Sequence, residues 1–415
     1  MIFKIFAGWS LISKTKRSVM KSDKGDPMET LEHKKIVYVT SAYFPFGQAY
    51  STRVIAFSKL LKHLGYSVHV IADFSLEQKR AGETEDCSYE IVGRDSSFSR
   101  WVVNANASYK RLKEYLERHD VAFVIMNGGK HGRFKNISKL CAERKIPLIL
   151  EICEWFDKSS FKLNRFDPRY INMGRCMNKT FRSANGVIAI SRFLESHFRE
   201  IGIKTIRIPT ILDTEAYKRS EMTWNNHIRL IFAGSIGHNK ESFRNIMLAL
   251  KSIDEKNLFD FYIYGGNRNQ IFENIGKDES LFAAVDDIVN YIGKIPQAEI
   301  HDAYQSADYQ IFIRPDRRSS HAGFPTKLAE SMVAGTPVIT NDTGDIGLYL
   351  KSGDNGYLLK DSSPESIKEA LEKTLQLTGD EIIKMRKAAR KMAEESFDYR
   401  IYAQPMQDFL EEVCR

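Results

Sequence analysis

The sequence predicts an α/β protein made of two doubly wound domains. The chain has 415 residues, which is too long for one ordinary core. Short β-branched strands alternate with helical segments, and this alternation stops and restarts around residues 210–227. Hydrophobic residues make up 43% of the chain and charged residues 27%, which is typical of a globular protein.

The first α/β domain is predicted over residues 36–215. Residues 36–44 have the pattern of a buried strand, and a helix over residues 50–65 follows and ends on Gly65. The next strand is expected at residues 67–74, which completes a βαβ unit and indicates a parallel sheet. Further strands are predicted at residues 121–126, 147–152 and 186–191.

The second domain is predicted over residues 222–398, after a segment at residues 206–213 and a polar stretch. A helix is expected to open after Gly323, and a long polar helix is expected at residues 379–397. In open α/β sheets, ligands bind where strands end and helices begin, so the loops after the strands are the places to search for a site. The predicted strands are residues 228–234, 259–265, 288–293, 309–314 and 337–341.

The net charge of +8 and the pI near 9.0 favour anionic partners. Residues 1–35 form a polar, basic extension, in which residues 1–22 place apolar side chains at helical spacing among five cations. This pattern predicts peripheral contact with an anionic membrane, although an extension without a role is the plainer alternative. The five cysteines are scattered, which argues against a disulfide framework or zinc site.

The segment 323-GFPTKLAESMVAGTPVIT-340 carries the strongest chemical signal. Lys327 and Glu330 are three residues apart and therefore share one face of the predicted helix. A lysine beside the first backbone N–H groups of a helix suits a phosphate, and a carboxylate one turn later suits a ribose diol. The alternative is a surface Lys–Glu pair worth only about 0.3–0.5 kcal/mol.

Three other loops follow predicted strands and contain glycine or cations. Residues 234–242 contain Gly234 and Lys240, residues 314–324 begin with Arg314, and Gly47 lies in the first strand-to-helix loop. None of these loops has the Gly-x-Gly-x-x-Gly pattern, so a nicotinamide cofactor is disfavoured. Asp-x-Asp and His-x-x-x-His are absent from the chain, so we expect neither a cofactor nor a metal.

Together these segments resemble the retaining glycosyltransferases of family 4. The resemblance covers roughly residues 35–400, and its most specific part is residues 323–339. It implies the GT-B architecture, in which two Rossmann-like domains face a cleft, with residues 399–415 returning to the first domain. It also implies transfer of a sugar from a UDP- or GDP-sugar to a glycan or lipid-linked acceptor in surface polysaccharide biosynthesis. The expected location is cytoplasmic, at the inner face of the membrane, with no nucleic-acid partner.

The resemblance assigns roles to individual residues. It implies catalytic roles, through charge stabilisation on the donor diphosphate, for Lys240, Lys327 and Arg314. The expected donor-binding residues are Gly47, Gly234, Ser235, Ile295, Pro325, Thr326 and Glu330. Glu330 is expected to bind the ribose hydroxyls and the Ile295 backbone to meet the base. The acceptor side is expected at Asn127, Cys153 and Glu154.

Three positions depart from the family pattern. Ala322 stands where the family has the first glutamate of a Glu-x₇-Glu motif, Ser235 replaces an arginine, and Cys153–Glu154 replaces a His-Asp pair. The alternatives that remain are a nucleotide-sugar epimerase of the same architecture, a two-domain periplasmic-type binding protein, and a non-catalytic nucleotide-sugar-binding scaffold. Ala322 is the best argument for the scaffold.

Overall fold

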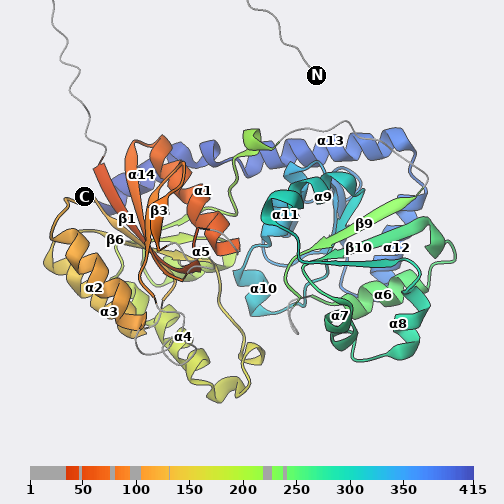
Figure 1. The fold of residues 1–415 in the computed structure, drawn as a ribbon, viewed down its shortest axis with the longest axis horizontal. Helices are drawn as coiled ribbons and strands as arrows, with labels where there is room; N and C mark the ends of the chain where they lie inside the picture. The colour runs from red at the N-terminus through yellow and green to blue at the C-terminus, as the bar shows by residue number, and fades with distance from the viewer. Residues whose placement is uncertain are drawn as a thin grey trace, which may run out of the picture. The chain divides into compact units, whose positions relative to one another are not determined.

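The computed structural model describes residues 34–45, 49–74, 80–93, 104–129, 131–217, 227–236 and 241–415. These residues form two α/β domains, each built on a mostly parallel sheet that helices cover (Figure 1). The predicted fold class is therefore confirmed. The basic extension at residues 1–33, with its predicted membrane segment, lies outside the described residues.

The first sheet has the order β3-β4-β2-β1-β5-β6-β7-β8. Its neighbours pair in parallel except for the antiparallel pair β3–β4. The order reverses direction at β1 and β5, so the carboxyl ends of these two strands mark the topological switch point. The strands are β1 (Lys34–Tyr43), β2 (Tyr66–Phe74), β3 (Ala81–Glu83), β4 (Ser88–Ile91), β5 (Val124–Asn127), β6 (Leu148–Ile152), β7 (Gly186–Ala189) and β8 (Thr205–Arg207).

Alternation along β1 divides the core of the first domain between two faces. Val37 and Val39 pack with residues of α2 and α3, whereas Ile36 and Tyr38 pack with α1 and α14. The α-helices that follow the strands of this domain are α1 (Ala49–His63), α2 (Asn104–Leu116), α3 (His131–Glu143), α4 (Pro168–Asn178) and α5 (Arg192–Glu200). The predicted elements of this domain are present, and the short strands β3 and β4 were not predicted.

The second sheet has the order β11-β10-β9-β12-β13-β14, and its described pairs are all parallel. Its strands are β9 (Ile228–Ala233), β10 (Phe259–Tyr264), β11 (Val289–Gly293), β12 (Tyr309–Ile311), β13 (Val338–Asn341) and β14 (Gly356–Leu359). Its helices are α6 (Phe243–Lys251), α7 (Arg268–Asn274), α8 (Glu279–Val285), α9 (Ile300–Ser306), α10 (Arg318–Ala322), α11 (Thr326–Val333) and α12 (Pro364–Leu375). The predicted strands of this domain are all present, and β14 was missed.

Residues 399–415, at the C-terminal end of the chain, pack on the first domain. α13 (Gly379–Ser396) is followed by the 3₁₀ helix η8 (Tyr399–Tyr402) and by α14 (Ala403–Val413). A Cβ atom added to Gly186 at the start of β7 would lie 2.7 Å from a ring carbon of Phe409 and 2.8 Å from Val413. The glycine thus lets α14 lie directly on β7.

A few polar contacts join residues of the first domain to residues of the second domain. Ser191 Oγ donates to the carbonyl of Ala322 at 2.8 Å, and both groups are buried. The Asp345 carboxylate accepts the backbone N–H of Arg192 at 3.0 Å and a guanidinium N–H of Arg207 at 2.9 Å. The end of β7 is therefore fixed to the loops around α10 and β13.

A buried charge cluster lies at the carboxyl edge of the first sheet. Glu151 on β6 is fully buried and accepts hydrogen bonds from Arg53, from Tyr38 and, at 2.7 Å, from Asn127 Nδ2. The other guanidinium nitrogens of Arg53 donate to the carbonyls of Ile208 and Pro209. Because each partner satisfies the other, the pair can remain charged in the core.

We expect Glu151→Ala to lower the free energy of unfolding of the first domain by about 3–5 kcal/mol, since it leaves the Arg53 guanidinium buried without its carboxylate. Urea unfolding at pH 7 measures the change. The matched control is Glu143→Ala, which removes an exposed pair with Lys139 at 3.7 Å and should cost less than about 0.5 kcal/mol. Equal effects of the two variants would contradict a structural role for the cluster.

Candidate active site

The carboxyl edge of the second sheet brings the strongest sequence motif to the loops after β9 and β12. α11 begins at Thr326, and Pro325 is its N-cap with extended backbone angles, φ −75° and ψ 110°. Pro325 itself lies just before the helix, because an extended ψ cannot belong to a helical turn. Pro325 has no side-chain acceptor, so the N-cap leaves the first N–H groups of the helix uncapped.

Lys327 reaches across the sheet edge from the first turn of α11. Its ammonium donates to Glu241 Oε1 at 2.7 Å, and the two side chains are only 14% and 8% exposed. The same nitrogen lies 4.1 Å from the centre of the Phe232 ring and 5.2 Å from that of Phe312. A carboxylate and two aromatic faces therefore hold one cation in a largely dehydrated position.

Gly234 directly follows β9 and lies next to this ammonium. Its φ is +156°, and an added Cβ would lie 3.1 Å from Lys327 Nζ. The neighbouring Gly265 has φ +93°, and a Cβ there would lie 2.3 Å from the Gly234 carbonyl. Both glycines are needed by packing: one leaves room for the lysine head, and the other lets two loop backbones touch.

Arg314 follows β12 and lies near the Glu241 carboxylate that binds Lys327. Its Nη1 donates to the Ser320 carbonyl at 3.1 Å, and its backbone N–H donates to Asn341 Oδ1 at 2.9 Å. Burial lowers the pKa of its guanidinium, while the nearby Glu241 carboxylate acts in the opposite direction. Lys327, Arg314 and Glu241 thus form one charged cluster, in which two cations share one carboxylate.

Glu330 lies one turn further along α11. Burial raises the pKa of its carboxyl to about 7, and the Lys327 charge only partly offsets this. Its charge in turn contributes to the raised pKa values of the Tyr217 and Tyr304 hydroxyls, for which burial is the main cause. Although Lys327 and Glu330 share a helix face, the ion pair of Lys327 is with Glu241, so a simple intrahelical pair is not what the motif encodes.

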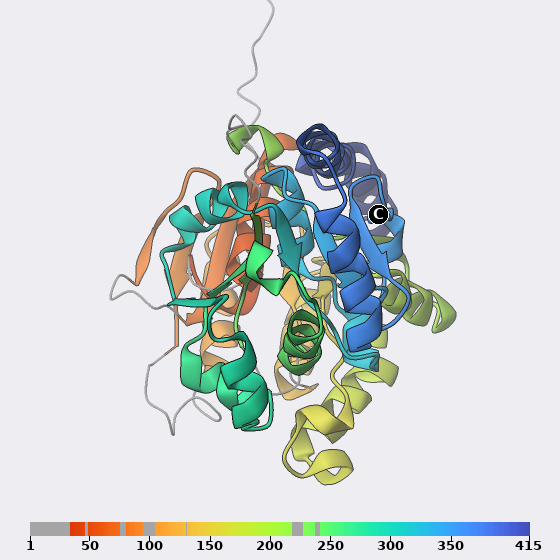
Figure 2. The ribbon, with the colours of Figure 1, turned by 90° about the vertical axis from the view of Figure 1, so that its right-hand side faces the viewer.

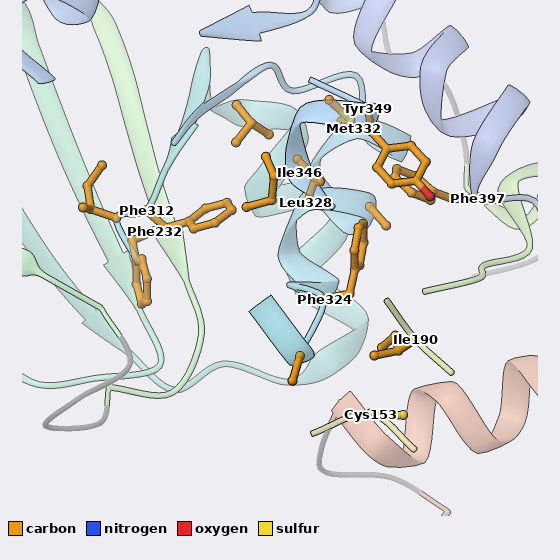
Figure 3. Packing of buried hydrophobic residues seen from close by; sticks show 14 of the residues in the cluster. Cys153, Ile190, Phe232, Phe312, Phe324, Leu328, Met332, Ile346, Tyr349 and Phe397 are labelled. Atoms are coloured by element: carbon orange, nitrogen blue, oxygen red, sulfur yellow. The ribbon is translucent and has the colours of Figure 1, made fainter. Parts of the chain in front are cut away.

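The apolar face of α11 fixes the helix in the core (Figure 3). Leu328 and Met332 are fully buried in the same core as Ile346. Just before the helix, Phe324 packs its ring against Tyr349 and Phe397, with centroids 5.5 and 5.7 Å away. This packing lets the polar face carry Lys327 and Glu330 without moving.

The remaining donor-side residues predicted from the sequence are spread around this cluster. Ser235 is exposed after Gly234, and Thr326 is partly buried at the start of α11. Ile295 packs against a small core that contains Tyr304 and Ala334, on the side of Glu330. Gly47 and Lys240 lie outside the described residues, so their predicted roles stay predictions.

The three predicted acceptor-side residues lie at the end of β5 and β6. The amide of Asn127 is committed to the buried Glu151, which is a structural role. Cys153 is buried, and burial raises the pKa of its thiol well above the usual range. Glu154 is partly buried and lies near Tyr50, whose hydroxyl pKa is raised mainly by burial and further by this carboxylate.

The arginine run after β12 divides between two tasks. Arg314 belongs to the charged cluster, whereas Arg318 donates to the Phe156 carbonyl at 2.6 Å and stacks on Trp155 at 4.9 Å. Arg317 donates to Ser159 Oγ at 3.3 Å. Two of the three arginines in residues 314–324 therefore contact the first domain.

Ala322 is fully buried, and its carbonyl accepts the Ser191 hydroxyl. A Cβ added to Gly323 would be tight only against the Ser319 carbonyl, at 3.2 Å, and would lie at an ordinary contact distance of 3.6 Å from the Cys153 carbonyl of the first domain. The position that carries a carboxylate in the family pattern thus holds a methyl group inside the core.

Sequence reasoning missed Glu241 and the two phenylalanines that hold Lys327. Phe232 lies within β9 and Phe312 lies just after β12. Each belongs to a short apolar run, and such a run indicates only a buried strand. Glu241 directly follows Lys240, and its acidic charge beside a cationic loop was a signal that could have been used. Within the described ranges, no group of three or more His, Cys, Asp or Glu side chains could hold a metal ion.

The raised pKa of Glu330 predicts a pH-dependent stability. The carboxyl is neutral in the folded protein up to about pH 7 but ionises near its ordinary value of 4.5 when unfolded. Stability contributed by the neutral form is therefore full below pH 4.5 and is lost as the pH rises toward 7.

We expect Glu330→Gln to match the parent at pH 5 or below and to exceed its free energy of unfolding at pH 8 by up to about 3 kcal/mol. Urea titrations at the two pH values measure the difference. Glu369→Gln, at an exposed position of α12, should show the same stability as the parent at both. A Glu330→Gln variant that is less stable at pH 8 would contradict a buried, unfavourable carboxylate.

Comparisons with known proteins agree with this arrangement. Residues 227–377 match the family model described as glycosyl transferases group 1, and curated protein sequences give no match. Sucrose-phosphate synthase from Thermosynechococcus elongatus has a similar structure, with a TM-score of 0.73 at 14% identity, over 92% of this chain and 99% of that one. HepE from Anabaena, solved with UDP and glucose, has a TM-score of 0.66 at 14% identity, over 91% and 100%. WaaG, a glycosyltransferase involved in lipopolysaccharide biosynthesis, has a TM-score of 0.63 at 14% identity, over 90% and 99%.

The solved structures share the arrangement of two parallel sheets, and the family match falls on the domain that carries the Lys327 cluster. The chain therefore has the GT-B fold, and its second domain is similar to the glycosyl transferases of group 1.

Proposed function

We propose that the chain transfers a sugar from a nucleotide diphosphate sugar, UDP- or GDP-linked, to a glycan or lipid-linked acceptor with retention of the anomeric configuration. The observation that carries this proposal is the position of Lys327, held above Gly234 by Glu241 at the start of α11. The structure of HepE with UDP-glucose, on the same fold, supports a nucleotide sugar as donor.

In this proposal, the donor diphosphate binds at the start of α11. Lys327 and Arg314 supply two cations, and the first N–H groups of the helix add the positive end of its dipole. Gly234 and Ser235 let the backbone of the β9 loop approach the phosphates. Charge-assisted hydrogen bonds of this kind contribute roughly 1.5–3 kcal/mol each.

The nucleoside lies deeper along α11 in this proposal. Glu330 accepts the ribose hydroxyls, and its ionised form is favoured when two O–H donors replace the water that burial removed. The Ile295 backbone faces the base. Since Lys327 and Glu330 are one turn apart, the distance between diphosphate and ribose is set by the rigid helix between them.

The chemical step needs little from the protein besides charge stabilisation. As negative charge develops on the leaving diphosphate, Lys327 and Arg314 stabilise it, together with Lys240 from the adjacent loop. The departing phosphate then accepts the proton of the acceptor hydroxyl on the face from which it leaves, so the new bond has the same configuration as the old one. No protein nucleophile or metal ion takes part in this scheme.

The acceptor is expected at the carboxyl edge of the first sheet, near Glu154. The proposed pathway is surface polysaccharide biosynthesis, supported by the fold shared with WaaG and with a lipopolysaccharide outer core galactosyltransferase, WaaB. No helix within the described ranges is long and apolar enough to cross a membrane. The proposed location is the cytoplasm, at the inner face of the membrane.

A non-catalytic scaffold is the second candidate, and the buried methyl group of Ala322 favours it. Both candidates bind the nucleotide sugar, so turnover separates them. Protection from thermal unfolding by a panel of UDP- and GDP-sugars identifies the donor. Proton NMR of a reaction with that donor then shows whether a glycoside forms and whether its anomeric configuration is retained.

Lys327→Ala should lower the transfer rate by about 10²–10³-fold, because a preorganised cation on the leaving group is lost. The variant should keep the parent circular dichroism spectrum, since the apolar face of α11 is unchanged. Lys351→Ala removes an exposed lysine of the same domain and should transfer at the parent rate. Parent-like transfer by Lys327→Ala would show that the diphosphate binds elsewhere.

A further inference from the structure

Residues 158–182 form a cationic segment between β6 and β7, which we name the basic excursion. It contains seven lysines and arginines and a single acidic residue, Asp167. Its elements are the 3₁₀ helices η1 (Lys158–Ser160), η2 (Asn164–Phe166) and η3 (Thr180–Ser183), together with α4. In both views this stretch, yellow to yellow-green, extends away from the first sheet (Figures 1 and 2).

The basic excursion presents large apolar side chains to solvent. Leu163 is 62% exposed, Phe166 69% and Ile171 57%. Among the described residues, the other three exposed large hydrophobic side chains are only 37–45% exposed. Isolated exposed apolar residues are ordinary, but three within nine positions of one protruding segment indicate a contact surface.

Cations surround these apolar side chains. Lys158, Lys162 and Arg165 are exposed, and Arg165 stacks on the Phe166 ring at 4.9 Å. On α4, Ile171 and Arg175 are both exposed and lie four residues apart, hence on one face. Asp167 offsets only the charge of Arg169, with which it pairs at 2.8 Å, and it also caps α4. The other cations of the segment keep their positive charge.

The base of the excursion is fixed to the rest of the molecule. Arg169 lies over the Phe161 ring at 5.1 Å, and Arg318 lies over Tyr170 at 5.7 Å. The Asp157 carboxylate accepts the backbone N–H of Ser319 at 2.9 Å, and Cys176 and Met177 of α4 are buried. The exposed apolar tips are therefore held outward by a packed base.

We propose that the basic excursion binds the surface of a membrane rich in anionic lipids, with Leu163, Phe166 and Ile171 entering the headgroup–acyl boundary. Charge complementarity selects this partner: the apolar tips need a nonpolar phase, and the surrounding cations need negative charge beside it. A second copy of this chain offers the same positive charge at the same surface, which opposes self-association there. The residues of this surface include none of those proposed above to bind the nucleotide.

Sedimentation with vesicles tests the proposal on the full chain. Vesicles that contain phosphatidylglycerol should bind the parent, and pure phosphatidylcholine vesicles should bind it weakly. The triple variant Leu163→Ser, Phe166→Ser, Ile171→Ser should lower the partition coefficient at least about tenfold. The control variant Ile292→Ser, Ile401→Ser alters two exposed apolar residues elsewhere, 45% and 43% exposed, and should bind like the parent.

Charge is tested in the same assay. Lys158→Glu, Lys162→Glu, Arg165→Glu should lower the partition coefficient at least about tenfold, and the effect should shrink at high salt. Lys351→Glu, Lys360→Glu, Lys391→Glu is the control, with the same charge change at exposed positions of the second domain and α13. Circular dichroism establishes that each variant is folded.

A reporter at the tip locates the contact independently of residues 1–22. With Phe166→Trp, brominated lipids should quench the added fluorescence when vesicles bind. Absence of this quenching, equal binding by the test and control variants, or equal binding to neutral vesicles would overturn the proposal. So would a monomer–dimer equilibrium in light scattering that the triple serine variant abolishes, since it would assign the surface to a second copy. None of these outcomes bears on the nucleotide site.

Discussion

The site depends on one fixed cation. Lys327 is held at 2.7 Å from Glu241, over the face of Phe232 and above a glycine whose missing side chain makes room for it. Because the ammonium is attached to the first turn of α11, its position also fixes Glu330 one turn later. The glycines at 234 and 265, Phe232 in β9 and Phe312 just after β12, and the apolar face of α11 all contribute to this placement. Because such a cation faces the start of a helix, we propose that a diphosphate binds here.

The Glu241 carboxylate gives the cluster its balance. It compensates two partly buried cations, Lys327 and Arg314, which would otherwise repel each other in a region of low dielectric. One oxygen, Oε2, is buried without a hydrogen-bond partner among the described residues. A carboxylate beside a phosphate-binding site disfavours the anion, so we infer that Glu241 orients Lys327 at some expense in affinity for the diphosphate. The first domain uses a similar arrangement at Glu151, but there every oxygen is satisfied and the role is structural.

Much of the fold and part of the site could be predicted from the sequence. Buried parallel strands such as residues 36–44 and 228–234 are largely apolar runs, and Gly65 ends the first helix as expected. Strands β3 and β4 were missed because they are short edge or near-edge strands with few apolar residues to mark them. Strand β14 is an edge strand of four residues, which is too short to show a clear strand pattern. Lys327 and Glu330 stood out through their spacing. Glu241 did not, because it pairs with a residue 86 positions away, and only the folded sheet brings the two loops together. The excursion at residues 158–182 was basic and aromatic in sequence, and only its exposure indicates a surface role.

The most direct test of the nucleotide site is a calorimetric comparison of nucleoside diphosphates with monophosphates. Once the base is known from the sugar screen, the diphosphate and monophosphate of that nucleoside differ only in the group that Lys327, Arg314 and the start of α11 are placed to bind. We expect the diphosphate to bind at least about tenfold more tightly, because one charge-assisted hydrogen bond contributes about 1.5–3 kcal/mol. Equal affinities for the two nucleotides would contradict a diphosphate site at Lys327.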